Sequence, residues 1–183
     1  MGCDIHSYIE YAEFTANDGQ PYWKNFTKNN GSRNYVMFGV LAGVRVPEAK
    51  LFDPKGMPEG RLGFDTSDDY WDCVAPESNP EWADSDDWVS LEQAERWVES
   101  GYSVGERDEN GRLRRVSGPD WHSHSWLNFT EVQQAMDHYL SQSSKFWPNE
   151  MNELPAEWLA TLAAMKAFED AGKQTRLVFW FDN

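Results

Sequence analysis

Hydrophobic and polar side chains alternate at the start of the chain. Over residues 2–11 one side of the pattern carries Cys3, Ile5, Ser7 and Ile9, and the other carries Asp4, His6, Tyr8 and Glu10. A period of two residues predicts a β-strand. The turn signal at residues 17–19 (Asn-Asp-Gly) follows, so residues 20–26 are expected to return as the second strand of a hairpin, before a polar loop over residues 27–32.

A helical spacing of side chains follows in residues 33–45. The members of one face are Tyr35, Phe38, Leu41, Ala42 and Arg45. Gly39 and Gly43 weaken this helix but allow another element to approach closely, and Pro47 is expected to end it. Capping residues and periodicity predict further helices over residues 90–101, 129–140 and 155–171.

The remaining segments complete the predicted fold. Residues 47–80 are rich in Gly, Pro and Asp, which predicts a long irregular segment. A hairpin is expected over residues 102–116, and the apolar run at residues 175–181 predicts a buried, central strand. Hairpins and helices interleave without a regular βαβ rhythm, so we expect an α+β fold. It would have a small mixed or antiparallel sheet with several flanking helices and that irregular segment, in a single domain over residues 1–183.

The chain is strongly acidic, with a net charge of −15 from 31 Asp and Glu against 16 Lys and Arg. Binding to duplex nucleic acid is therefore not expected, because phosphate contacts need clustered basic residues. The acids concentrate between Asp65 and Glu109, which is typical of a solvated face or of a surface that imitates DNA phosphates. In the second case, function depends on Asp84, Asp86 and Asp87.

The sequence also indicates where the protein works. Its longest apolar runs are too short to cross a bilayer and no signal-peptide pattern precedes Asp4, so we expect a soluble, cytoplasmic protein without a membrane partner. The two cysteines, Cys3 and Cys73, form neither a disulfide framework nor a metal knuckle, and we expect both to be reduced.

Three histidines lie in two polar clusters: His6 near the start of the chain, and His122 and His124 in the sequence DWHSHSW. In an extended segment a His-x-His pair places both imidazoles on one side, with Cβ atoms about 7 Å apart. If this segment faces the first strand, the three imidazoles and the carboxylate of Asp4 converge as a shell for Zn²⁺, Mn²⁺ or Fe²⁺. An open position for water would make that shell a hydrolytic centre.

Other side chains complete the candidate site. Asp120 and Glu10 are expected to orient the imidazoles or to act as a general base. Arg33 and Arg45 would neutralise charge on phosphoryl oxygens. The aromatic members of the predicted ligand-binding set are Tyr35, Trp121 and Trp126; the two indoles, like the Tyr22-Trp23 pair, also suit the core or a pocket wall. Without a metal, the three histidines act as general acid and base or donate hydrogen bonds to a ligand, and a structural network is the remaining interpretation.

Three motifs together resemble a family of small proteins of tailed phages and bacteria, which is defined by its sequence pattern and not by an established activity. They are MGCDIH at residues 1–6, Arg-Asn-Tyr…Phe…Leu-Ala…Val-Arg at residues 33–45, and His-Ser-His-Ser-Trp-Leu at residues 122–127. Residues 54–58 (Pro-Lys-Gly-Met-Pro) stand where the family pattern has Pro-Arg-Gly-Leu-Pro. The match covers residues 1–127 in patches.

The resemblance implies a small accessory protein that disarms host defences in the host cytoplasm by binding or degrading a nucleotide signal. The leading hypothesis is therefore a protein that binds or hydrolyses a phosphorylated, nucleotide-like small molecule at an Asp/His/Arg site, as a metal-dependent hydrolase in the catalytic version. The alternative is an acidic protein-interaction inhibitor of the DNA-mimic or anti-restriction type, with no small-molecule site. A homo-oligomer is compatible with either hypothesis.

Overall fold

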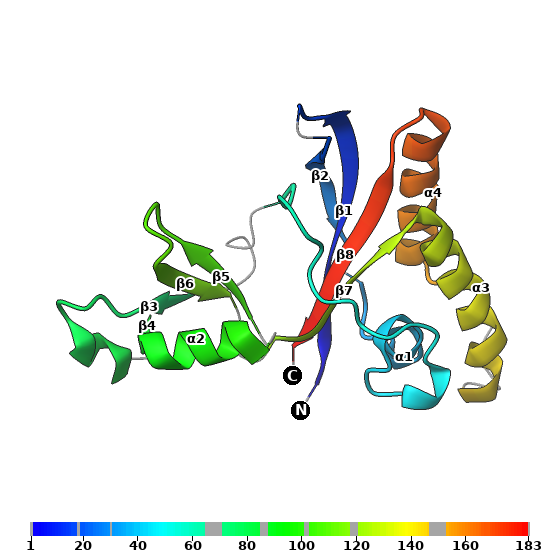
Figure 1. Ribbon diagram of the computed structural model, residues 1–183. Helices are drawn as coiled ribbons and strands as arrows, with labels where there is room; N and C mark the ends of the chain where they lie inside the picture. The colour runs from blue at the N-terminus through cyan, green and yellow to red at the C-terminus, as the bar shows by residue number, and fades with distance from the viewer. Residues whose placement is uncertain are drawn as a thin grey trace.

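The computed structural model describes residues 2–17, 19–29, 31–64, 71–84, 88–100, 103–117, 121–146 and 153–182. In these residues the chain forms two four-stranded sheets and four α-helices, which confirms the predicted α+β class (Figure 1). The strand order is β2-β1-β8-β7 in the main sheet and β4-β3-β6-β5 in the second sheet.

The main sheet joins the two ends of the chain. Its strands are β1 (Asp4–Thr15), β2 (Pro21–Asn29), β7 (His122–Asn128) and β8 (Thr175–Asp182), and each neighbouring pair is antiparallel. Residues 175–181 of β8 are all buried, as predicted for a central strand. The predicted β1–β2 hairpin is confirmed, but the loop expected from Thr27 is wrong over residues 27–29. These residues pair with β1 as far as Ser7, and ladder hydrogen bonds outweigh their polar, turn-like composition.

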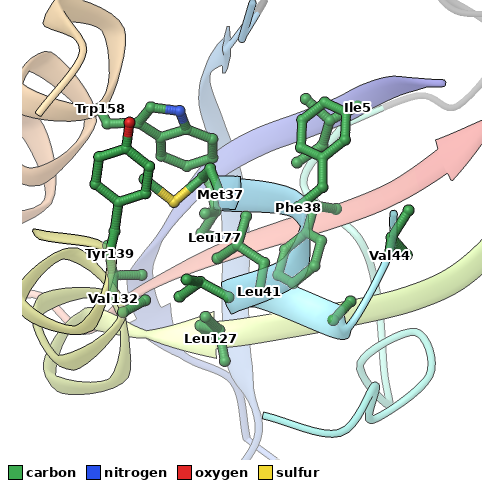
Figure 2. Close-up of a cluster of buried hydrophobic side chains, with 14 of the residues drawn as sticks. Ile5, Met37, Phe38, Leu41, Val44, Leu127, Val132, Tyr139, Trp158 and Leu177 are labelled. Carbon is green, nitrogen blue, oxygen red and sulfur yellow. The ribbon is translucent and has the colours of Figure 1, made fainter. Parts of the chain in front are cut away.

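Three helices cover one face of the main sheet: α1 (Tyr35–Ala42), α3 (Phe129–Phe146) and α4 (Ala156–Asp170) (Figure 1). Their shared core is formed around α1, and its large members include Met37, Phe38, Leu41, Leu127, Tyr139, Trp158 and Leu177 (Figure 2). Helix α1 ends earlier than Pro47, because Gly43 adopts the left-handed conformation at φ 72° and donates its N–H to the carbonyl of Gly39. Gly39 also meets the backbone of Val46 closely, the close approach expected from its lack of a side chain.

The other face of the main sheet is crossed by residues 51–64, which we call the covering segment (Figure 1). It contains no helix or strand, as predicted for this part of the chain. At one edge the N–H of Gly56 donates to the carbonyl of His124 at 2.9 Å, and at the other edge the N–H of Asn25 donates to the carbonyl of Gly63 at 3.2 Å. Between these edges Phe64 stacks on Tyr8 with ring centroids 3.9 Å apart. The covering segment therefore closes this face over a second small core.

The second sheet has its own hydrophobic cluster. Its strands are β3 (Trp71–Val74), β4 (Trp88–Val89), β5 (Val104–Arg107) and β6 (Leu113–Ser117), and helix α2 (Leu91–Ser100) packs on it. The predicted helix and the β5–β6 hairpin are confirmed. The irregular segment expected over residues 47–80 is wrong where β3 forms, and β4 was not predicted either, because both strands are short and lie within the acidic stretch. None of the helices in the described residues is long and apolar enough to cross a membrane.

Candidate functional site

The two ends of the described chain meet at one end of the main sheet, where Asp4 pairs with Asp182 and His6 with Trp180 (Figure 1). Because side chains alternate along a strand, Asp4 and His6 point away from the helices, to the side of Asp182 and Trp180. Arg33, which precedes α1, pairs with Asp4, and Arg45, which follows α1, reaches the carbonyl of Gly2 at the same end of the sheet. We call these five residues the terminal cluster: Asp4, His6, Arg33, Arg45 and Asp182.

An imidazole–carboxylate pair lies within the terminal cluster. Nε2 of His6 is 2.7 Å from Oδ2 of Asp182, and the other carboxylate oxygen accepts the N–H of Asp4 at 3.2 Å. The side chains of His6 and Asp182 are 18% and 28% exposed, so solvent reaches both. The imidazole also lies 5.7 Å from the ring of Trp180 and 5.2 Å from that of Trp121. One carboxylate and two indoles thus fix the orientation of this histidine.

Arg33 forms a bidentate ion pair with the carboxylate of Asp4. Its Nε donates to Oδ1 at 2.5 Å and its Nη2 donates to Oδ2 at 2.7 Å. This hydrogen bonding holds the pKa of Asp4 below its usual range, so the carboxylate is charged at neutral pH. Gly2 makes the arrangement possible, because a Cβ at this position would lie 2.6 Å from Cζ of Arg33.

Arg45 approaches from the turn that follows α1, with a positive φ of 62°. Its Nη2 donates to the carbonyl of Gly2 at 3.4 Å, and its guanidinium lies 6.0 Å from the ring of Tyr35. Burial raises the pKa of the neighbouring Cys3 thiol, and a hydrogen bond from Arg45 opposes this rise. The predicted residues Asp4, His6, Arg33, Tyr35 and Arg45 are therefore brought together.

The expectation that His122 and His124 share one face is wrong. Strand β7 has a bulge between His122 and Ser125, and Ser123 inside it has a positive φ of 54°. The extra residue reverses the alternation. As a result His122 stacks against Phe181 on the helix side, at 6.0 Å, whereas His124 stacks against Trp180 on the opposite side, at 6.1 Å.

The predicted metal shell is not assembled by these side chains. Within the described residues there is no group of three or more His, Cys, Asp or Glu side chains that could hold a metal ion. The bulge separates two of the expected ligands, and both oxygens of Asp4 are engaged by Arg33. Asp120 lies outside the described residues.

Glu10 does not join the histidines. It lies four residues farther along β1 than His6, about 13 Å away at 3.3 Å per residue. There its Oε2 accepts a hydrogen bond from Nε of Arg176 at 2.5 Å, and its Oε1 accepts one from the N–H of Gly63. Burial raises the pKa of Glu10 from its usual value. Its role is to balance a buried arginine, and it is too far away to orient the imidazole of His6.

The two predicted indoles have different positions. Trp121 is only 1% exposed and packs against Trp180 and His6, so it positions the histidine and has no face for a ligand. Trp126 is half-buried opposite Val178, near the middle of β8, and packs against the cluster that contains Trp121 and Trp180. Nζ of Lys55 lies 4.3 Å from its ring centroid.

Asp182 is the member of the terminal cluster that sequence reasoning missed. Its signal was a carboxylate at the end of an otherwise apolar strand, residues 175–181, whose partner strand was not known from the sequence. The alternative hypothesis of an acidic protein-interaction inhibitor depends on Asp84, Asp86 and Asp87. Asp86 and Asp87 lie outside the described residues, and Asp84 ends the 3-10 helix Pro80–Asp84.

Comparisons with protein-family models, with curated proteins and with solved structures found no match to this chain. The chemistry of the site is therefore inferred from its own geometry.

Proposed function

We propose that the protein binds a phosphorylated, nucleotide-like small molecule at the terminal cluster. The observation that carries this proposal is the convergence of two guanidinium groups and an oriented imidazole at one solvent-accessible end of the main sheet. Arginine forks suit phosphate oxygens, since they offer several donors in one plane and keep their charge.

The two arginines of the terminal cluster have different partners. Arg33 uses Nε and Nη2 to hold Asp4, and its Nη1 lies outside that pair. Arg45 is exposed, and its Nη2 donates to the carbonyl of Gly2 at 3.4 Å. A phosphate group at this end of the sheet would accept hydrogen bonds from Arg45 and from Nη1 of Arg33, with the imidazole of His6 beside it.

Binding is the primary role, and hydrolysis is a defined second outcome. A carboxylate that orients an imidazole is also the arrangement of a general base, and the His6–Asp182 pair has this form at 2.7 Å. The resemblance to small phage and bacterial proteins supports a role in removing a nucleotide signal from solution. Cyclic mono- and dinucleotides are therefore the first probes.

Isothermal titration of the purified protein with these nucleotides tests the proposal. We expect binding that weakens about tenfold or more in Arg45→Gln, because one charge-assisted contact is lost. Arg96→Gln, an exposed arginine on α2, is the matched control and should bind like the wild type. EDTA should leave the affinity unchanged.

The fate of the bound nucleotide separates the two roles. If the nucleotide is recovered intact from the wild-type protein after heat denaturation, the protein sequesters it. If the wild-type protein alters the nucleotide and the His6→Gln variant does not, the protein hydrolyses it. The proposal is rejected if the wild type binds none of the phosphorylated probes, or if Arg45→Gln binds them equally well.

A further inference from the structure

A cavity of about 420 Å³ lies at the opposite end of the main sheet from the terminal cluster. Its wall includes Trp23, Trp126, Asn128, Thr130, Gln174 and Arg176. These residues come from the strands at both edges of the sheet, from the start of α3 and from the start of β8. The volume is within the range of small-molecule sites, about 300–1,000 Å³.

Two indoles line this cavity, and each is backed by a cation. The guanidinium of Arg176 lies 4.0 Å from the ring centroid of Trp23, and Nζ of Lys55 lies 4.3 Å from that of Trp126. Such contacts hold an aromatic ring in place. Both indoles also line the cavity wall, so each presents part of its ring to the cavity.

The two cations beside the cavity are each paired with a carboxylate. Arg176 is paired with Glu10 at 2.5 Å, and Lys55 with Glu131 at 2.6 Å. The carboxylate of Glu169 accepts both the N–H and the hydroxyl of Thr175, each at 2.8 Å. An anionic ligand would therefore find no unpaired cation among these groups. The uncharged polar groups at the rim are the amides of Asn128 and Gln174 and the hydroxyl of Thr130.

We infer that this cavity binds a neutral, planar heteroaromatic ring, namely a purine base. Indole faces stack on such a ring, and the amide and hydroxyl groups meet the hydrogen-bonding edge that a hydrocarbon ring lacks. The site differs from the terminal cluster, because Arg176 lies four residues along β8 from Trp180, about 13 Å. It requires no phosphate and goes beyond the proposed function.

Titration with adenosine and guanosine, which carry no phosphate, tests this site. We expect one nucleoside to bind to the wild type, and Trp126→Leu to weaken its binding about tenfold, since a stacked face is lost. Trp82→Leu removes an exposed indole near the second sheet and should leave the affinity unchanged. Thr130→Leu places an alkyl group at the rim from an exposed helix position and should also weaken binding, which covers the case of Trp126→Leu failing to fold.

Arg45→Gln serves as the test of independence. It should bind the nucleoside like the wild type, whatever its effect on phosphorylated probes. The inference is overturned if neither nucleoside binds, if free indole binds but the nucleosides do not, if the folded cavity variants bind as well as the wild type, or if Arg45→Gln loses nucleoside binding.

Discussion

Glu10 and Arg176 form an ion pair with almost no contact with solvent, at 0% and 5% side-chain exposure. Burial raises the pKa of Glu10 and lowers that of Arg176, since each charge has lost its hydration. Such a pair adds little net stability, but removal of one partner leaves the other charge buried and unbalanced. Arg176 of this pair also lines the cavity next to Trp23.

Glu10→Gln is expected to lower the free energy of unfolding by about 3 kcal/mol, because the guanidinium of Arg176 loses its counter-charge in the core. Urea denaturation monitored by circular dichroism measures the change. Lys166→Gln, in the exposed pair with Asp170, is the control and should cost less than about 0.5 kcal/mol. A Glu10→Gln variant as stable as wild type would show that the pair is not desolvated in solution.

At the scale of elements, the covering segment determines which parts of the main sheet reach solvent. Its backbone hydrogen-bonds to the edge strand β7 at Gly56 and to the edge strand β2 at Gly63. Its Phe64 ring stacks against the rings of Tyr8 and Trp180. A Cβ on Gly63 would lie 2.5 Å from the carbonyl carbon of Lys24 and 2.6 Å from the backbone nitrogen of Asn25. Backbone cannot yield as a side chain can, so only glycine fits here.

Gly63→Ala is expected to destabilise the protein by about 1–3 kcal/mol, because the segment must lift from β2 to make room. Loss of aromatic packing between Phe64 and Tyr8 should reduce the near-ultraviolet circular dichroism signal, and amide exchange of residues 56–64 should accelerate. Glu59→Ala, at an exposed position of the same segment, should change neither measurement. Equal exchange rates in Gly63→Ala and wild type would contradict the tight contact.

For the whole molecule, the net charge of −15 sets a long-range repulsion that acts against compactness. Salt screens this repulsion, with a Debye length of about 8 Å at 0.15 M. We expect the melting temperature to rise by about 2–4 °C between 10 and 300 mM NaCl, as for a gain on the order of 1 kcal/mol. The effect should shrink near pH 5, where protonation starts to reduce the net charge. A melting temperature that falls with salt would indicate that exposed ion pairs, such as Arg33–Asp4, outweigh the repulsion.

Local patterns were sufficient for most of the elements. The period-two alternation of residues 2–11, the capping signals at the starts of α2, α3 and α4, and the apolar run of β8 each identify an element, because the physical cause acts over a few residues. The end of α3 was predicted wrongly, since the helix continues past Leu140 to Phe146. The gathering of Asp4, His6, Arg33 and Arg45 was also expected. The assignment of the helices and strands follows from hydrophobic burial and backbone preference, which act between residues close together in the chain.

Tertiary structure alone decided the geometry of the candidate site. The bulge at Ser123 sends His122 and His124 to opposite faces, and no short-range pattern distinguishes it from regular alternation. Asp182 reaches His6 only because β8 pairs with β1, a contact between residues 176 positions apart. Glu10 is drawn to Arg176 by the same pairing. Strand register and bulges depend on how whole elements pack, so the sequence by itself determined the elements and the tertiary structure determined which side chains meet.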